Sequence, residues 1–128
     1  MTSQITEGVA ISVEVKYEAD YSNTVNNEFM FAYKITIENQ NAFPIKLLSR
    51  HWYIFDSNAT KREVQGDGVV GEQPIINPNQ KYHYISGCNL NSEMGSMHGT
   101  YLFENLFNKS VFQTIIPQFH MAVPFKLN

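Results

Sequence analysis

Three glycines near the middle of the chain have the spacing of a phosphate-binding loop. Gly66, Gly68 and Gly71 form a G-x-G-x-x-G pattern, whose unhindered backbone amides could surround a phosphate. That chemistry needs a strand before the loop and a helix after it, because the phosphate lies at the helix N-terminus. Two β-branched valines, two prolines and a pair of isoleucines occur instead in residues 69–78, and they disfavour a helix. We therefore expect a structural turn, with anion binding as the alternative.

The charges near this loop bear on the same choice. Asp67 and Glu72 lie inside the loop and would repel an anion, so a bound phosphate would need Arg50 or Arg62 to offset them. The alternative function is thus a small-ligand sensor that binds pyrophosphate or a dinucleotide polyphosphate at the glycines, with Arg50 or Arg62 supplying the positive charge.

The other residues that could bind a metal or act in catalysis are scattered along the chain. The four histidines (His51, His83, His98 and His120) lie on different predicted segments, so none forms the local ligand pair of a metal site. We expect His51 and His83 to be cross-strand partners or half-buried polar groups, and a metal site assembled through space is the alternative. Cys88 lies in a predicted loop, and nothing marks a base beside it. The sequence therefore predicts no enzyme, no cofactor and no metal.

Four apolar residues are candidates for contact with a partner. Trp52 and Tyr53 are interleaved with basic residues of the same third of the chain, and Leu106 and Phe107 lie between asparagines in a predicted hairpin connection. Apolar groups at positions where solvent is expected either fold back onto the core or form a contact surface. Both interpretations stay open for Leu106 and Phe107.

The elements that position these residues are strands. Alternation of apolar and polar residues, with a period of two, is typical of half-buried strands, and the spacing of turn residues favours an all-β, immunoglobulin-like or fibronectin type III-like β-sandwich of about seven to eight strands. We expect one domain over residues 1–128. The clearest predicted strands cover residues 9–18, 29–38, 50–56, 61–65, 81–84, 97–104 and 110–116.

Four segments carry more specific expectations. Residues 43–48 contain Pro44 and should form a short edge segment, because a proline cannot donate to a central ladder. Residues 50–56 have large side chains on both faces, which indicates a central strand covered on both sides. Residues 87–96 should form a loop, and residues 117–124, with two prolines, an extended edge or tail.

Composition excludes several classes of protein. The net charge of −3 and pI of about 5.7 argue against a nucleic-acid-binding role. The single cysteine rules out a disulfide framework within the chain and fits a reducing cytoplasm. The sequence lacks a signal peptide and any stretch of about 18 apolar residues, so we expect a soluble, cytoplasmic protein without a membrane partner.

Five separated motifs resemble those of the bacterial ApaG (CorD) family, in order and at family spacing over residues 9–124. These motifs are Ser49-Arg50-His51-Trp52, the stretch Gly66-Asp67-Gly68-Val69-Val70-Gly71-Glu72-Gln73-Pro74, Tyr84-Ile85-Ser86-Gly87-Cys88, Gly95-Ser96-Met97-His98-Gly99-Thr100-Tyr101, and Ile116-Pro117-Gln118-Phe119. The chain departs from the family pattern at Asn79, where a glycine is common, and in the turn at residues 105–109.

The resemblance implies a sandwich fold, an interaction role, and an association with cobalt and magnesium homeostasis. It supplies no catalytic residues, and it suggests the glycine motif as a pyrophosphate site. The leading hypothesis is a non-enzymatic binding module that contacts a protein partner, with Trp52 and Tyr53 near the contact.

Overall fold

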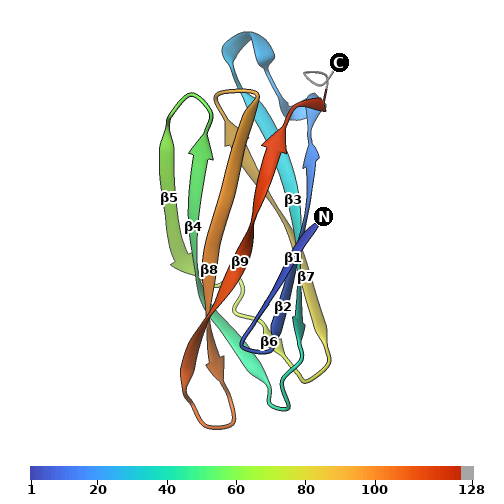
Figure 1. The fold of residues 1–128 in the computed structure, drawn as a ribbon, viewed down its shortest axis with the longest axis vertical. Coiled ribbons are helices and arrows are strands. Elements are labelled where there is room, and N and C mark those ends of the chain that lie inside the picture. The colour runs from blue at the N-terminus through green and yellow to red at the C-terminus, as the bar shows by residue number, and fades with distance from the viewer. Residues whose placement is uncertain (125–128) are drawn as a thin grey trace.

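The protein is built from two antiparallel sheets that pack face to face (Figure 1). A computed structural model describes residues 1–124. Two single-turn 3-10 helices, η1 (Ala19–Tyr21) and η2 (Thr24–Asn26), lie between the second and third strands. The strands are β1 (Thr2–Thr6), β2 (Val9–Tyr17), β3 (Phe29–Asn39), β4 (Ile45–Asp56), β5 (Lys61–Asp67), β6 (Ile75–Ile76), β7 (Lys81–Leu90), β8 (Met94–Asn105) and β9 (Val111–Ala122).

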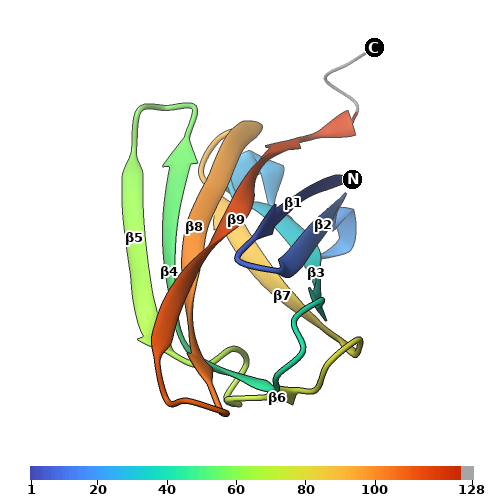
Figure 2. The same ribbon diagram turned by 60° about the horizontal axis from the view of Figure 1, so that its bottom comes forward.

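The order of the strands confirms the predicted all-β sandwich. The first sheet has the order β1-β2-β3-β7, and the second has the order β5-β4-β8-β9, with β6 pairing with one end of β4. Figures 1 and 2 show the two layers, with β5 along an outer edge of the second sheet. No helix in residues 1–124 is long and apolar enough to cross a membrane.

The core between the sheets is formed by alternate residues of the strands. β3 shows this most regularly, because every second residue from Phe29 to Asn39 is buried. At the centre of the core, Trp52 of β4 is only 3% exposed and packs edge-on against Tyr33 at 5.5 Å and Phe119 at 6.0 Å. Burial of one such aromatic side chain contributes roughly 1.5–3 kcal/mol to stability.

Several strands are longer than the sequence indicated, and β4 and β7 differ most from expectation. Residues 45–48, expected as a separate edge segment, belong to β4, because a register shift between Leu47 and Ser49 lets the strand continue against β8. Gly87 and Cys88, expected in a loop, are paired with β3 as part of β7. Glycine weakens a strand, but the continuous ladder of β3 holds this segment extended.

The two ends of the chain also form strands. β1, which was not predicted, pairs with β2. The predicted last strand and the segment after it are one strand, β9, at the edge of the second sheet. Pro117 lies in β9 where the pairing with β8 shifts register between Met97 and Gly99, which is where a strand tolerates a proline.

β4 is central as expected, but it is covered on one face only. Trp52 and Ile54 point into the core, whereas Tyr53 and Phe55 on the opposite face are 38% and 42% exposed. The expectation that residues 50–56 are covered on both sides is therefore wrong. In the part of the chain that the structure describes, the outer face of the second sheet is thus exposed at β4 and carries large apolar side chains.

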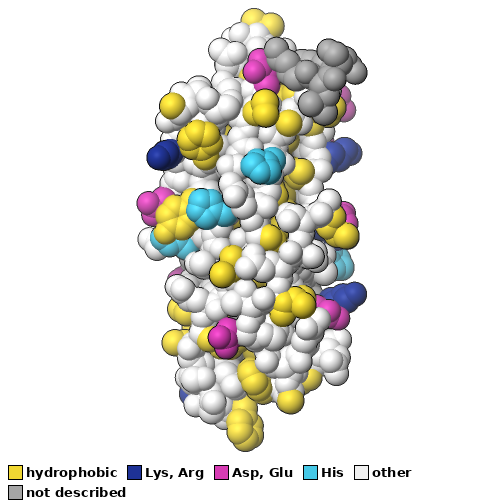
Figure 3. Space-filling view, in the orientation of Figure 1, with side chains coloured by type: hydrophobic (Ala, Val, Ile, Leu, Met, Phe, Trp, Pro, Cys, Tyr) yellow, Lys and Arg dark blue, Asp and Glu magenta, His cyan; other side chains and the backbone are white. Residues whose placement is uncertain are grey.

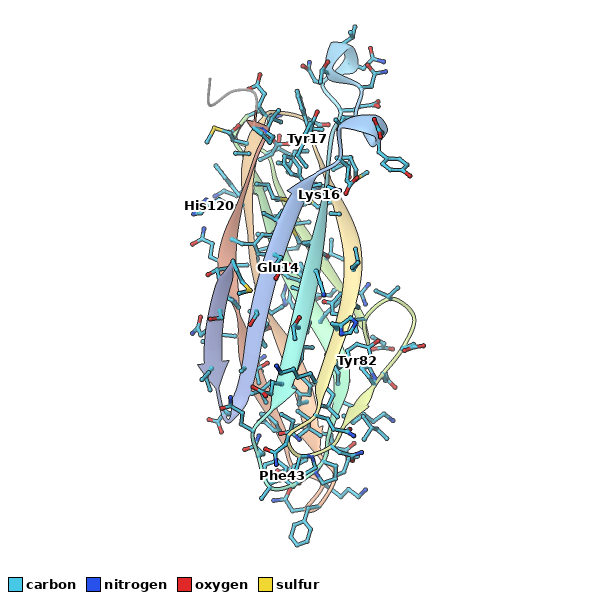
Figure 4. The ribbon with its side chains drawn as sticks, turned by 90° about the vertical axis from the view of Figure 1, so that its right-hand side faces the viewer. Glu14, Lys16, Tyr17, Phe43, Tyr82 and His120 are labelled. Atoms are coloured by element: carbon cyan, nitrogen blue, oxygen red, sulfur yellow. The ribbon has the colours of Figure 1, made fainter. Side chains whose placement is uncertain are left out.

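The outer face of the first sheet is different in character. Figure 4 shows Glu14 and Lys16 pointing outward from β2, and Glu14 lies opposite Lys34 of β3. Oppositely charged side chains across a strand pair are typical of a solvated face. The outer face of the second sheet, in contrast, carries the exposed aromatic side chains of Tyr53 and Phe55.

Candidate binding face of the second sheet

A stack of three rings lies on the outer face of the second sheet. Tyr53 lies between His51 on its own strand and His98 of β8, with ring centroids 4.4 Å and 5.1 Å away and interplanar angles of 24° and 14°. Alternation along β4 puts His51 and Tyr53 on one face, and the register of the sheet places His98 directly opposite Tyr53. The three rings therefore hold one another in place.

β5 fixes the orientation of the first ring. The side-chain amide of Gln65 donates to Nδ1 of His51 at 3.0 Å, and Nε2 of His51 lies 2.8 Å from a carboxylate oxygen of Glu63. Because an amide nitrogen can only donate, Nδ1 is the acceptor and Nε2 carries the proton that is donated to Glu63. These two contacts keep the His51 ring nearly parallel to Tyr53.

Two grooves open beside the stack. The larger has a volume of about 650 Å³, and the second, of about 390 Å³, shares Tyr53, His98 and Gln118 with it. Figure 3 shows histidine and apolar side chains together on this face, over β4, β8 and β9. We call this surface the outer aromatic face. It consists of His51, Tyr53, Phe55, Glu63, Gln65, His98, Ile115 and Gln118.

The chemistry of the outer aromatic face is that of binding. The rings offer stacking surfaces and the grooves offer apolar walls, while Glu63 and Gln65 are engaged with His51. The ring of Tyr53 separates the two histidines. Residues 1–124 contain no group of three or more histidine, cysteine, aspartate or glutamate side chains that could hold a metal ion.

The one thiol is not placed for nucleophilic chemistry. Cys88 is buried, and this burial raises the pKa of its thiol despite the nearby Arg62 guanidinium. A reactive cysteine needs the opposite shift, because the thiolate is the nucleophile.

The glycine stretch forms a turn with its own internal hydrogen bonds. Gly68 N–H donates to Leu48 O at 2.9 Å, and Val69 and Glu72 exchange N–H···O bonds of 2.8 Å and 3.0 Å. Val70 and Gly71, the central residues of this turn, both have positive φ, as a type I′ hairpin turn requires. The chain continues into β6. This confirms the prediction that no helix follows the glycines.

Arg50 lies at this turn and is engaged there. Its Nη1 donates to the carbonyl oxygens of Asp67 and Gly68 at 3.0 Å and 2.9 Å, and its guanidinium passes over Gly66, where a Cβ would lie 2.9 Å from Nη1. Gly66 is thus explained by the space that Arg50 needs. The arginine closes the loop, and anion binding at the glycines stays a prediction that no contact in the structure favours.

Arg62 does not accompany Arg50. It lies opposite Ile54, four residues before Gly66, a distance of roughly 13 Å along the strand. Its guanidinium donates to the carbonyl oxygen of Asn89 in the other sheet. This arrangement corrects the expectation that Arg62 supplies charge to the glycine loop, since Arg62 bridges the edges of the two sheets instead.

The four predicted contact residues lie in three separate places. Trp52 is in the core and has no surface to offer, which corrects its assignment as a contact residue. Tyr53 is at the centre of the outer aromatic face. Leu106 is half-buried and Phe107 is 83% exposed at the tip of the β8–β9 hairpin, roughly 25 Å along β8 from His98.

Sequence reasoning missed most of the outer aromatic face. His51 and His83 were expected as cross-strand partners or half-buried polar groups. They are not partners, because His51 lies opposite Gln65 and Thr100, whereas His83 is in the first sheet opposite Thr36. His51 is half-buried, as expected, but His83 is exposed. His51, Tyr53 and Phe55 lie on one face because alternate residues of a strand point the same way, but the sequence analysis grouped Tyr53 with Trp52 instead. The register that brings β5 and β8 to that face had no signal in the sequence.

The comparisons with known proteins agree on one family. A family profile described as the ApaG domain matches residues 19–105. The "Protein ApaG" of Pseudomonas aeruginosa is 44% identical over 117 residues, which cover 91% of each chain, and that of Anaeromyxobacter dehalogenans is 38% identical over 128 residues, the whole of each chain. A crystal structure of a Bordetella pertussis protein described as ApaA superposes with a TM-score of 0.87, at 36% identity and over 91% of this chain and 94% of that one.

None of these descriptions names an enzymatic activity. With a profile that covers most of the strands and relatives near 40% identity over almost the full length, the chain belongs to the ApaG domain family.

Proposed function

We propose that this protein is a non-enzymatic binding module, and that a protein partner docks on the outer aromatic face. The observation that carries the proposal is Tyr53, which is 38% exposed and oriented between two imidazole rings. Within residues 1–124, β1 reaches this face only at its border, where Gln4 lines the smaller groove. Tyrosine is enriched at protein interfaces, because it offers a large rigid contact area and a hydroxyl group.

The surroundings of Tyr53 support a partner with apolar side chains. Phe55 and Ile115 on the same face are 42% and 46% exposed, and the groove of about 650 Å³ beside Tyr53 and Phe55 is large enough for a side chain of the partner. Exposed apolar residues that are contiguous on one face typically mark an interaction site. A groove with a polar rim, here Lys61 and Glu63, has the anatomy of an interface core.

A link to cobalt and magnesium homeostasis belongs to this proposal through the partner. The family association suggests such a role, while residues 1–124 show no cluster of metal-ligating side chains. The module would act on ion levels by binding a protein that handles the ions.

Site-specific photo-crosslinking tests the proposal. A benzophenone amino acid replaces Phe55 in the full chain in bacterial cells, and the matched control places it at Ile85, which is 64% exposed on β7 in the other sheet. We expect an adduct with a protein other than this chain from position 55 and none from position 85, identified by mass spectrometry. The same adduct should be lost when Tyr53→Ala is combined with the probe.

The control for folding is the thermal unfolding of each variant, which should stay cooperative. Identical adducts from positions 55 and 85, or an adduct that persists at full yield in the Tyr53→Ala background, would overturn the proposal. Adducts from a probe at Phe107, but not from Phe55, would move the interface to the tip of the β8–β9 hairpin.

A further inference from the structure

Within the described residues 1–124, β5 is an exposed edge strand with no neighbour on its outer side. In this part of the chain it pairs only with β4, and both ribbon views show it along the outer edge of the molecule (Figures 1 and 2). Of its seven residues only Gly66 is partly covered. An edge of this kind presents a row of backbone donors and acceptors that another strand can use.

The pairing with β4 shows which backbone groups face outward. Gly68 N–H donates to Leu48 O at 2.9 Å. In an antiparallel ladder, residues whose backbone groups bond to the neighbouring strand alternate with residues whose backbone N–H and C=O groups point away from it. In the register of β4 and β5, the residues whose backbone groups point to the free edge are therefore the odd-numbered ones. These are Lys61, Glu63, Gln65 and Asp67, whose side chains lie on the outer face of the sheet.

The sequence of this edge is complementary to itself. We propose that β5 pairs antiparallel with β5 of a second copy of this chain, about a twofold axis at Val64. In this register Lys61 lies opposite Asp67 of the second copy, on both sides of the axis, and Glu63 lies opposite Gln65. Two pairs of opposite charge are formed, and directly opposed charges of unlike sign stabilise an antiparallel pair.

Charge also selects this register over the adjacent ones. The second copy of β5 can shift along the first only in steps that keep odd residues opposite odd residues, because a one-residue slip would turn each side chain to the other face of the sheet. One such shift places Glu63 opposite Glu63 of the second copy, and the other places Glu63 opposite Asp67. Both bring carboxylates together, so the register centred on Val64, which is 38% exposed, is the one without repulsion.

The contacts already made by β5 are compatible with this pairing. Glu63 and Gln65 bind His51 on the outer face, and Arg62 reaches the opposing sheet. Arg50 Nη1 donates to the backbone oxygen of Asp67, but a carbonyl oxygen has a second lone pair that can accept from a neighbouring strand. Nothing in the described part of the chain forms a hydrogen bond or ion pair with the side chains of Lys61 and Asp67. These two residues are free to pair between copies, in a small interface that gives a weak, concentration-dependent dimer.

Sedimentation velocity over a range of protein concentrations tests the proposal with charge reversals. The wild type should shift from monomer to dimer as concentration rises, and Lys61→Glu or Asp67→Lys alone should raise the dimer dissociation constant roughly tenfold or more, because both symmetric pairs become repulsive. Lys16→Glu, on the outer face of the first sheet, changes the net charge as Lys61→Glu does and should leave the constant unchanged.

An equimolar mixture of the two single variants gives the decisive result. The carboxylate introduced at position 61 of one copy then meets the ammonium group introduced at position 67 of the other, while the unchanged Asp67 of the first copy meets the unchanged Lys61 of the second. The two separately monomeric variants should therefore form a heterodimer, and such a rescue also excludes misfolding of either variant. A wild type that stays monomeric at millimolar concentration, or a dimer unaffected by both reversals, would overturn the proposal and show that the charges of β5 serve to keep the edge unpaired.

Discussion

Trp52 and Tyr53 are adjacent aromatic residues with opposite environments. Trp52 packs in the core and Tyr53 lies on the outer aromatic face. We expect Trp52→Ala to lower the free energy of unfolding by about 3–5 kcal/mol, because it leaves a cavity between the sheets. Tyr53→Ala should cost about 1 kcal/mol or less, mainly from the lost stacking. Denaturant unfolding measures both, and equal losses would contradict the assignment of Tyr53 to a binding role.

Val70 is held in a backbone conformation that β-branched residues rarely adopt. Its φ is 49° and its side chain is 62% exposed at the tip of the type I′ turn, so no packing explains the strain. Asparagine and glycine are the residues this turn position favours. We expect Val70→Asn to raise the free energy of unfolding by about 1 kcal/mol.

The control for that change is Val25→Asn, which alters an exposed valine without a positive φ and should change stability by less than about 0.5 kcal/mol. If Val70→Asn lowers stability instead, the turn is not of the type that the structure shows.

Two buried tyrosines make stability depend on alkaline pH. Tyr84 and Tyr101 share a hydrogen bond between their hydroxyl groups in the core, and burial raises the pKa of both. Because the pKa is raised in the folded state, the neutral tyrosines contribute their full stability below the ordinary tyrosine pKa of about 10. This contribution is lost as the pH rises from about 10 through the raised pKa of the folded state.

Unfolding in urea at about pH 8 and about pH 11 checks this dependence. Stability should fall between the two, and the double variant with Tyr84→Phe and Tyr101→Phe should show a smaller fall, because it has no hydroxyl to ionise there. An unchanged fall in the double variant would assign the alkaline sensitivity to other groups.

At the scale of the elements, the close approach of β4 and β8 depends on a glycine. A Cβ at Gly99 would lie 2.1 Å from the backbone oxygen of His51, whereas a Cβ at Gly87 in β7 would meet nothing closer than 3.5 Å. We expect Gly99→Ala to destabilise the protein by roughly 1–3 kcal/mol or more, because the two strands must move apart. Gly87→Ala is the matched control, with a change within about 0.5 kcal/mol. Similar melting temperatures for the two variants would contradict this account.

The same scale shows how far the sequence predicted the elements. Period-two alternation was sufficient for β3, where one face is buried throughout, and for β2, where Val9, Ile11 and Val13 are buried. It failed where the chain carries residues that usually end a strand. Gly87 in β7 and Pro117 in β9 are accommodated by a neighbouring ladder and by a register shift, and both compensations come from strands distant in sequence.

At the scale of the whole molecule, the candidate site combines side chains of one strand with neighbours from strands that are distant in sequence. Alternation along β4 placed His51, Tyr53 and Phe55 together, but Glu63 and His98 join them only through the pairing of β4 with β5 and β8. The sequence could not show whether another layer covers this face, since large side chains on both faces are also typical of a strand buried twice.

The electrostatic field of the whole molecule argues against the remaining ligand hypothesis, which is the binding of pyrophosphate at the glycine loop. The chain has a net charge of −3, and Asp67 and Glu72 lie at the loop. The one arginine there, Arg50, donates to two carbonyl oxygens of the loop, and the amides of Gly68 and Val69 already donate within the protein. A polyanion would have to break these contacts and approach against repulsion.

We therefore expect backbone-amide NMR spectra to stay unchanged when pyrophosphate or diadenosine tetraphosphate is added to millimolar concentration. Asp67→Asn serves as the comparison, because it removes one repelling charge and leaves the backbone contacts of Arg50 in place. Saturable shifts confined to Gly66, Gly68, Gly71 and their neighbours would contradict the expectation and establish the loop as a ligand site. Shifts that appear only in Asp67→Asn would show that repulsion, and not the internal hydrogen bonds of the turn, keeps the anion out.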